Sequence, residues 1–404
     1  MPHSSPPPFD VAICGGGMVG MSLGIALAQA GLAVALVEKT ALSSQLELSF
    51  DGRVSAIAEG SRRILDSIGA WKTMAAEAEP ILDIRVSDGD APFFLHYDHR
   101  EVGDAPFGFI VENRYIRHAL HQAAAALPTL TVMDKTEVQS FERDDVGVTL
   151  RLKDKELRCR LLVGADGKQS QIRTWVGITS VDWKYRQTAI VCTIKHELPH
   201  GGLAQERFLP AGPFAVLPMR RNHSSLVWVE PDDRVKLYME LPEEEFVQEI
   251  SERVGEYLGG IETAGPRFSY PLSLMHAKRY VAPRLALIGD AAHAIHPIAG
   301  QGVNLGFRDV GALAELVIDR FRLGLDVGSD DVLAHYQRWR RFDNVAMLAV
   351  TDGLNRLFCT GWAPVRLARG AGLWAVGKLP PLKRFFMRDA MGLVGDLPRM
   401  VKNQ

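Results

Sequence analysis

The hydrophobic positions of the first forty residues predict a β-α-β unit. Val11 to Cys14 and Ala33 to Val37 are short, continuously apolar runs, typical of parallel strands that are buried on both faces. Between them, Val19 to Ala30 is rich in Ala, Leu and Met and predicts a helix. Two later apolar runs, Leu161 to Ala165 and Leu285 to Ile288, predict further strands of the same sheet.

The periodicity changes in the middle of the chain. Residues 187–230 alternate between apolar and polar, which predicts antiparallel strands, and residues 243–258 predict an acidic helix. From Arg53 to Gly69 the apolar residues recur at roughly helical spacing, so this segment predicts a helix. From Val303 onward the pattern is mostly helical.

These patterns together predict an α/β fold in which a parallel-sheet, Rossmann-like domain is discontinuous in sequence. We assign residues 9–75, 98–180 and 275–360 to that domain. Residues 76–97 and 181–274 form an inserted domain with a mixed or antiparallel sheet, and residues 361–404 form a C-terminal helical tail.

Composition narrows the class of protein. The 404 residues are 47% hydrophobic and 23% charged, with a net charge of −2, so a nucleic-acid partner is not expected. Cys14, Cys159, Cys192 and Cys359 are scattered without a CxxC pair, which fits neither a disulfide framework nor a zinc site.

Targeting signals are absent from the pattern. The first ten residues lack the basic and apolar regions of a signal peptide, and no apolar run reaches the roughly 18 residues that a membrane span needs. We therefore expect a cytoplasmic protein, attached to a membrane at most peripherally.

The string GGGMVG, Gly15 to Gly20, lies directly between the first predicted strand and helix. Gly15 permits a tight turn, Gly17 lets a pyrophosphate approach the backbone, and Gly20 lets helix and strand pack closely. Glu38, at the end of the second strand, is placed to accept hydrogen bonds from a ribose. The combination predicts a dinucleotide site.

Two later predicted strands each end in an aspartate, Asp166 and Asp290. An aspartate just past a parallel strand lies where ligands bind in such sheets, and it can accept a hydrogen bond from a sugar or ribitol hydroxyl. Taken alone, the string GADGKQSQIR that contains Asp166 is better explained as a plain strand-to-turn signal, whereas the string LIGDAAH that contains Asp290 fits either interpretation equally.

The string HPIAGQGVNLGFRD, His296 to Asp309, places glycines before a predicted helix. Bare backbone at a helix N-terminus presents amide donors and a positive dipole, which suits the negative charge of a reduced flavin. His293 and His296 are three residues apart, but no carboxylate or cysteine cluster accompanies them, so no metal site is expected. His296 is either a catalytic base or, as we prefer, a residue packed near the flavin.

These four motifs together resemble those of the class A flavoprotein monooxygenases, and HPIAGQGVNLGFRD is similar to the signature of the ubiquinone-biosynthesis hydroxylases of the UbiH/UbiF/UbiI type. The resemblance spans nearly the whole chain from Asp10. It implies bound FAD, NAD(P)H as a transient reductant, and O2. The implied reaction hydroxylates the aromatic ring of a polyprenylated phenol on the route to ubiquinone, through a C4a-hydroperoxyflavin.

The resemblance also implies which residues contact FAD, while it assigns no catalytic residue. The glycine turn and Glu38 would hold the pyrophosphate and adenosine ribose, and Asp290 the ribitol. Asp166 belongs to a motif shared by FAD and reductant binding. The implied FAD contacts are Gly15, Gly17, Gly20, Glu38, Arg53, Arg117, Asp166, Asp290, Gly300, Gly302, Val303 and Asn304, with a flavin-facing loop that contains His296, Pro297, Gly300, Gln301 and Gly302.

The segment Phe208 to Met219 resembles the family segment that walls the substrate cavity, which points to Phe208, Pro213, Phe214, Leu217 and Pro218. Trp183 and Trp228 either line a pocket or, as is usual in a sheet, belong to the core.

Two other functions stay open. A hydroxylase of a small soluble aromatic acid would need a cationic clamp, for which Arg207 and Arg220 are candidates. A non-catalytic FAD-fold scaffold of a biosynthetic complex is the other alternative, although the bare glycines beside the flavin argue against it.

The tail is basic. Residues 362–404 contain eight Lys or Arg and two Asp or Glu, and KLPPLKRFFMRDAMGLVG combines basic residues with Phe385, Phe386 and Met387. Such a helix either lies on an anionic membrane surface or packs against protein. A membrane contact would suit a hydrophobic prenylphenol substrate, and the family also implies a possible multiprotein ubiquinone-biosynthesis complex.

Overall fold

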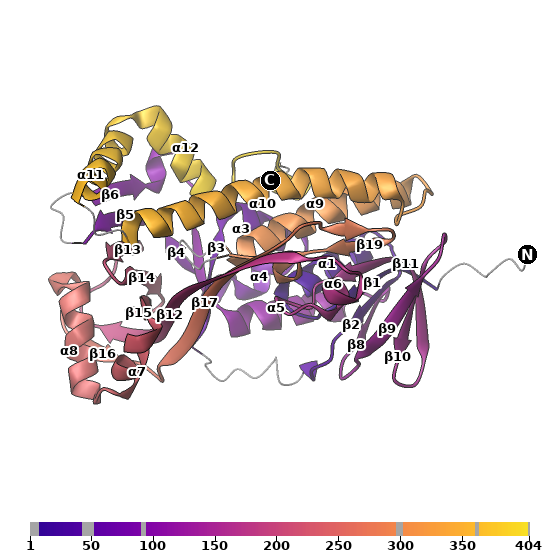
Figure 1. Ribbon diagram of the computed structural model, residues 1–404, viewed down its shortest axis with the longest axis horizontal. Helices are drawn as coiled ribbons and strands as arrows, with labels where there is room; N and C mark the ends of the chain where they lie inside the picture. The colour runs from indigo at the N-terminus through magenta and orange to yellow at the C-terminus, as the bar shows by residue number, and fades with distance from the viewer. Residues whose placement is uncertain (1–7, 43–51, 90–93, 296–301, 360–362, 403–404) are drawn as a thin grey trace, which may run out of the picture.

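The computed structural model describes residues 8–42, 52–89, 94–295, 302–359 and 363–402 (Figure 1). Its first sheet contains the predicted β-α-β unit, with the parallel strands in the order β19-β11-β1-β2-β8. Its strands are β1 (Phe9–Cys14), β2 (Val34–Val37), β8 (Leu130–Met133), β9 (Val138–Arg143), β10 (Val148–Leu152), β11 (Glu156–Gly164), β18 (Val281–Ala282) and β19 (Leu285–Leu287).

Helices cover this first sheet because its parallel strands are apolar on both faces. Helix α1 (Met18–Gln29) packs on β1, β2 and β8 and contacts α5 (Asn113–Ala125) and α9 (Gly302–Arg322). The core residues of β1, β2 and α1, such as Ile13, Leu36 and Leu23, are fully buried. The shorter helices are α3 (Glu59–Ser67), α4 (Trp71–Met74), α6 (Gln171–Trp175) and the 3-10 turns η1 (Ala75–Glu77), η2 (His99–Glu101) and η4 (Gly289–Ala291).

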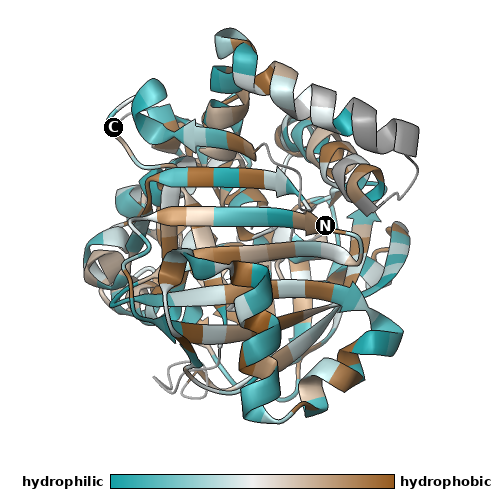
Figure 2. Cartoon of the chain, turned by 90° about the vertical axis from the view of Figure 1, so that its left-hand side faces the viewer, coloured by the Kyte–Doolittle hydropathy of each residue, from teal (hydrophilic) through white to brown (hydrophobic). Residues whose placement is uncertain are grey.

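The second sheet is mostly antiparallel, as its alternating sequence predicts, and its strands carry alternate hydrophobic and hydrophilic bands (Figure 2). Its main path is β20-β17-β12-β15-β14-β13-β5-β6, with β16 paired to β12. The strands are β5 (Asp83–Asp88), β6 (Phe94–Asp98), β12 (Ser180–His196), β13 (Leu203–Leu209), β14 (Gly212–Met219), β15 (His223–Pro231), β16 (Ile261–Thr263), β17 (Phe268–Ala277) and β20 (His293–Ala294).

The two faces of the second sheet have different partners. The helix face carries Ile190, Phe214 and Trp228 and is covered by α7 (Asp232–Glu240) and α8 (Glu243–Val254), which the turn η3 (Glu256–Leu258) follows. The inner face carries Ala204, Leu217 and Met219 and packs toward the rest of the molecule. Because successive strand residues point to opposite faces, each residue of β13 and β14 can be placed on one face or the other.

A small third sheet corrects one prediction. Strand β3 (Val54–Ala58) pairs with β7 (Gly108–Glu112), which also pairs with β4 (Glu79–Ile81). The predicted helix from Arg53 to Gly69 is therefore wrong in its first turn and a half, since α3 begins only at Glu59. The spacing of Val54 and Ile57 is compatible with a helix, but pairing with β7 makes this segment a strand.

The C-terminal third is helical, as predicted. Helix α10 (Asp330–Cys359) runs along the molecule and contacts α9, β18, β13 and β14, so it spans both large sheets (Figure 1). Helices α11 (Ala363–Lys378) and α12 (Pro380–Ala390) lie beside β5 and β6, and α13 (Arg399–Lys402) packs on α3 and α9. The predicted fold class is confirmed. The two large sheets draw their strands from alternating segments, while the exact domain boundaries stay a prediction.

Candidate FAD site

The glycine turn after β1 is as tight as the motif requires. Gly15 has a φ of +112°, and a Cβ on it would lie 2.2 Å from the carbonyl oxygen of Ala165. A Cβ on Gly20 would lie 2.0 Å from the carbonyl oxygen of Gly15, so helix α1 and the turn touch through bare backbone. A Cβ on Gly17 would meet nothing within 4 Å, which leaves open space directly above the N-terminus of α1.

Helix α1 presents uncapped amides to that space. Gly17 is its N-cap residue, no side chain caps the helix, and its first turn carries no acidic residue. The first amides of a helix lack partners within it and carry a partial positive charge, so a phosphate is the ligand that this end favours.

Glu38 at the end of β2 is already positioned by hydrogen bonds. Its carboxylate accepts from the amide of Gly16 at 2.7 Å and from the amide and hydroxyl of Thr40 at 2.8 and 2.7 Å. These hydrogen bonds connect the end of β2 to the glycine turn. They hold the Glu38 carboxylate beside that turn, where a ribose would lie.

Asp166 fixes the turn after β11. Its carboxylate accepts from the Ser170 hydroxyl at 2.5 Å and from the amide of Ile172 at 3.2 Å, so it orders the start of α6. The amide of Ala165 donates to the carbonyl of Cys14 at 2.7 Å, which brings this strand end against the Gly15 turn.

Asp290 lies in turn η4, directly after β19. Its side chain is exposed, yet enough protein surrounds it that burial raises the pKa of its carboxyl, an effect that His293 and Lys168 partly offset. We infer from an accessible carboxylate with this much protein around it that Asp290 borders a recess. Turn η4 contacts α9, and Gly289 and Gly306 both pack closely on Val19 of α1, so the end of β19 lies against the starts of both helices.

Asn304 links the start of α9 to the third sheet. Its side-chain amide donates to the carbonyl of Ala56 at 2.8 Å, and its side-chain oxygen accepts from the amide of Ala58 at 2.9 Å. The preceding residues His296, Pro297, Gly300 and Gln301 lie outside the described residues. Gly302 and Val303 form the first turn of α9, and a Cβ on Gly302 would meet nothing within 4 Å.

These features fit FAD. The glycine turn, the uncapped end of α1 and the Glu38 carboxylate suit a pyrophosphate and an adenosine ribose. Asp290 and the start of α9 are two further polar groups in the same recess, next to α1. An NAD site of the Rossmann type would need only the first three of these groups.

Comparison with known proteins agrees with this geometry. The family model described as "FAD binding domain" matches residues 8–361. Ubiquinone hydroxylase UbiL of Rhodospirillum rubrum is 49% identical over 397 residues, which cover 97% of this chain and 92% of that protein. The 3-demethoxyubiquinol 3-hydroxylase of Escherichia coli is 35% identical over 389 residues, covering 96% of this chain and 99% of that protein.

The chain belongs to this FAD-binding family. Its fold is also that of p-nitrophenol 4-monooxygenase PnpA of Pseudomonas putida, with a TM-score of 0.79 at 21% identity over 96% of this chain and 98% of that one. The resemblance to class A flavoprotein monooxygenases is thereby confirmed, and FAD is the cofactor.

Two arginines with predicted roles in FAD binding lie on neighbouring elements. Arg53 precedes β3 and is exposed, while Arg117 lies on α5 and is half-buried. The amide of Asn113, the first residue of α5, donates to the carbonyl of Arg53 at 3.0 Å and thereby connects the two segments. Their contacts with FAD stay a prediction.

Sequence reasoning missed a fully buried charge cluster behind the flavoprotein's FAD site. Asp309 of α9 lies 2.8 Å from the Arg340 guanidinium of α10 and 2.6 Å from Nε2 of His293, and it accepts from the Gly289 amide at 3.0 Å. Asp309 thus holds the η4 turn that carries Asp290. Its place at the end of the GFRD string was the available signal.

The predicted substrate wall divides between the two faces of the second sheet. Phe208 pairs with Pro213, and strand alternation puts both with Leu217 on the inner face. Phe214 belongs to the core of the helix face, with Trp228, and alternation places Pro218 on that face as well. We therefore keep Phe208, Pro213 and Leu217 as candidates for a wall that faces the flavin.

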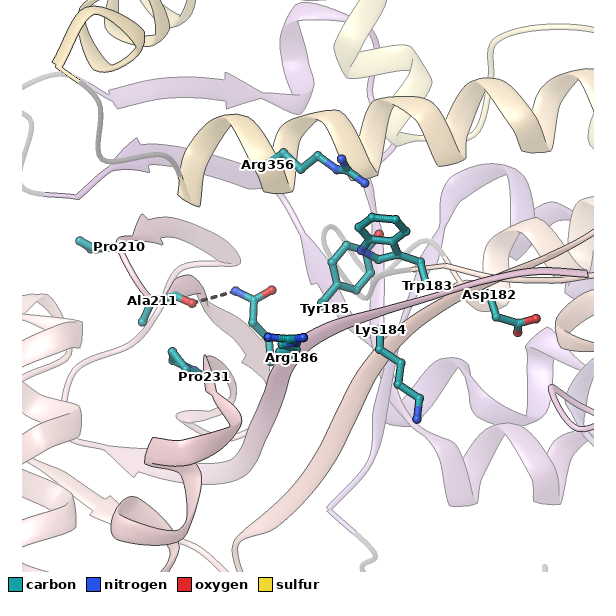
Figure 3. Close-up of a pocket in the computed structure, with 10 residues that line it drawn as sticks. Asp182, Trp183, Lys184, Tyr185, Arg186, Pro210, Ala211, Pro231 and Arg356 are labelled. Atoms are coloured by element: carbon teal, nitrogen blue, oxygen red, sulfur yellow. Dashed lines mark hydrogen bonds between the residues drawn. The ribbon is translucent and has the colours of Figure 1, made fainter.

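The two tryptophans take different roles. Trp228 belongs to the core, and its indole N–H donates to the Glu230 carboxylate at 2.8 Å. Trp183 is 48% exposed and lines a cavity of about 760 Å³ between β12 and α10, together with Tyr185 and Arg356 (Figure 3). The guanidinium of Arg356 lies 4.6 Å from the Trp183 ring centroid, and the Tyr185 hydroxyl donates to Asp352 at 3.0 Å.

The two arginines considered as a carboxylate clamp are bound elsewhere. Arg207 points to the helix face by alternation and donates to the carbonyl of Arg253 at 2.5 Å. Arg220 pairs with Glu77 at 3.0 Å, and both of those side chains are partly exposed.

Proposed function

We propose that this FAD-dependent monooxygenase hydroxylates the aromatic ring of a polyprenylated phenol on the route to ubiquinone, with O2 and NAD(P)H. The observation that carries the proposal is the character of the inner face. Its strands present Ala204, Phe208 and Leu217. An apolar face that we expect to lie toward the flavin suits a hydrophobic phenol, and the names of the two relatives reported above support this substrate class.

The same face disfavours a small aromatic acid. An enzyme for such an acid needs a cation that binds the substrate carboxylate, because burying that charge unpaired is costly. Arg207 and Arg220 are engaged away from this face, whereas Glu206 of β13, an anion, lies on it.

The test uses the purified FAD-loaded protein. We follow the oxidation of NADH, the oxidation of NADPH and the consumption of O2. Each rate is measured with a prenylphenol, with a phenolic acid that lacks the prenyl chain, and without substrate. We expect prenylphenol to stimulate all three, with a hydroxylated product in mass spectra that also identifies the ring carbon. Stimulation by the acid alone would reject the proposal, and no NAD(P)H oxidation with any substrate would favour a scaffold.

We also propose that α12 and the end of α11 contact an anionic membrane surface. Trp374, Leu379, Leu382, Phe385 and Phe386 are exposed there, and Leu382, Phe385 and Phe386 are spaced along one face of α12. Lys378, Arg384 and Arg388 are exposed nearby. Large apolar groups rimmed by cations suit the interface of an anionic bilayer.

Within the described residues, no helix is long and apolar enough to cross a bilayer. Surface contact is therefore tested by flotation with vesicles of phosphatidylglycerol or of phosphatidylcholine. The Phe385→Glu/Phe386→Glu variant should lose flotation with phosphatidylglycerol, while Leu237→Glu, an exposed apolar residue on α7, should keep it. Equal flotation of the wild type and both variants with phosphatidylglycerol would reject the contact. Membership of a multiprotein complex stays a prediction from the family.

A further inference from the structure

Glu206 is an acidic residue in an apolar position. It lies in the middle of β13, opposite Ala215 of β14 and Val86 of β5. Alternation places its side chain on the inner face between Ala204 and Phe208. A carboxylate in such surroundings costs free energy unless it has a partner or a function.

No partner is present among the described residues. Glu206 accepts no hydrogen bond and forms no ion pair there, unlike Asp88 on the same face, which is bound by Arg369 of α11 at 2.6 Å. The nearest strand neighbours on its face are aliphatic or aromatic. The unpaired carboxylate is therefore available to a ligand.

The side chain of Glu206 is enclosed and yet partly accessible. Helix α10 crosses β13 and β14, and Phe358 of α10 stacks on Phe208 at 3.9 Å between ring centroids. Despite this cover the Glu206 side chain is only half-buried. The Glu206 carboxylate therefore lies on the side of the sheet that α10 covers and not on the helix face.

The inner face of the second sheet borders the elements at the start of α9. The inner-face residues Ala204, Leu217 and Met219 belong to one apolar cluster with Ala56 of β3. Ala56 is the residue whose carbonyl binds Asn304 at the start of α9. Glu206, next but one to Ala204, thus lies on the same wall as the elements that hold the flavin-facing loop.

Burial raises the pKa of the Glu206 carboxyl, which suits a group that accepts a proton. Desolvation alone raises the pKa of its carboxyl from 4.5 to about 7, and no charged neighbour contributes. Its carboxylate is thereby made about 300 times more basic, while it stays ionised above neutral pH. The charged groups on the elements around it are the Asp88–Arg369 pair and Arg356, which pairs with Asp352.

We propose that Glu206 is the base that accepts the proton of the substrate's phenol hydroxyl. This inference rests on the proposed function. The phenol O–H bond breaks, the proton passes to a carboxylate oxygen of Glu206, and the electron pair stays on the phenolate oxygen. The phenolate enriches the ortho and para ring carbons in electrons, which is what attack on an electrophilic oxygen requires. The proton leaves Glu206 for water after turnover.

The first test compares wild type, Glu206→Gln, Glu206→Asp and Gln205→Leu, all loaded with FAD. Gln205 is the adjacent residue and points to the helix face, so its variant controls for changes in β13. Wild-type kcat/KM should rise with pH through about 7. Glu206→Gln should lose on the order of 10²-fold in kcat/KM, together with this rise, and Glu206→Asp should recover part of both.

A substrate with a more acidic phenol distinguishes proton acceptance by Glu206 from a purely structural role of this residue. Fluorination of the ring lowers the pKa of the phenol, so it should narrow the difference in rate between Glu206→Gln and wild type, measured with the same fluorinated substrate, but leave the ratio of Gln205→Leu to wild type unchanged. FAD content and the rate of flavin reduction should be the same in all four proteins, and Glu206→Gln should melt no lower than wild type, because it removes a carboxylate whose burial costs free energy. An unaltered pH profile in Glu206→Gln, or a loss that fluorination does not relieve, would overturn the proposal.

A binding measurement keeps this proposal distinct from the proposed function. An alkylated nitrophenol absorbs visible light only as its phenolate. Below the pKa of the free probe, wild type should bind it with the phenolate band and Glu206→Gln without that band. If prenylphenols are not hydroxylated but this difference persists, the substrate proposal fails and the base stands; if both proteins bind the neutral phenol, the base fails alone.

Discussion

The three glycines of the turn between β1 and α1, Gly15, Gly17 and Gly20, are needed for different physical reasons. Gly15 and Gly20 are required by the protein itself, since a Cβ on either would overlap backbone at 2.2 or 2.0 Å. Gly17 has ordinary extended backbone and open space around it, so the fold does not need a glycine there. Any requirement at Gly17 must come from a ligand in that space.

This difference is testable with two single substitutions. Gly17→Ala should keep the melting temperature of the apoprotein and lower FAD affinity by on the order of tenfold or more, because its methyl group points into the pyrophosphate space. Gly20→Ala should instead lower the melting temperature even without FAD, since helix α1 must move away. Titration of apoprotein with FAD and thermal melting measure both. Normal FAD affinity in Gly17→Ala would refute the placement of the phosphates.

Asp290 gives a second prediction at this scale. Its accessible carboxylate faces the recess, and an acceptor for a ribitol hydroxyl contributes about 1 kcal/mol or more when charged. Asp290→Ala should therefore weaken FAD binding by roughly tenfold, which the same titration measures. Asp326→Ala, a partly exposed carboxylate that pairs with Arg284 away from the recess, is the control. An unchanged dissociation constant in Asp290→Ala would remove Asp290 from the site.

Sequence reasoning reaches these residues unevenly. The glycines and Glu38 are predictable because their spacing within a β-α-β unit has a backbone cause. Val54 and Ile57 are not, because a spacing of three is typical of one helix face, and only the pairing of this segment with β7 makes it a strand. Glu206 is invisible in sequence because one acid in an alternating strand predicts exposure, and only helix α10 reveals that its side is covered.

At the scale of elements, the Asp309 cluster joins α9, η4 and α10. Burial by itself raises the pKa of Asp309, but His293 and Arg340 outweigh it with charge and hydrogen bonds and hold the pKa at about 2. Because the folded pKa lies below the ordinary value of 3.8, the ionised cluster stabilises the fold above about pH 4. That contribution is lost as the pH falls toward 2.

Asp309→Asn should lower the melting temperature at neutral pH by roughly 5 °C, because it removes the buried carboxylate that pairs with Arg340 and leaves Arg340 only Asp343 as a charge partner among the described residues. Its melting temperature should also vary less than that of wild type between pH 4 and 2. Asp326→Asn breaks a partly exposed pair with Arg284 and should cost about 0–1 kcal/mol. Melting curves across pH measure this, and equal shifts in the two variants would contradict the special role of the cluster.

At the scale of the molecule, helix α10 couples the two large sheets, since it packs on β18 of the first and on β13 and β14 of the second. FAD binds the folded state only, so at 100 times its dissociation constant it adds about 2.7 kcal/mol of stability. Removal of FAD should lower the melting temperature by roughly 3 °C, because a chain of this size has a large unfolding entropy. Far-ultraviolet circular dichroism and tryptophan fluorescence should report one shared transition, whereas two separate transitions would show that α10 does not couple the sheets.

The groups that position Glu38, namely the Gly16 amide and the amide and hydroxyl of Thr40, all belong to the protein, so no cofactor atom is needed to assemble the adenosine end of the site. A preassembled site spends little binding energy on rearrangement. The protein from which FAD has been removed should therefore bind synthetic flavins in place of FAD, without being unfolded and refolded. Replacement of FAD by such flavins would change the redox potential of the enzyme without any amino-acid substitution.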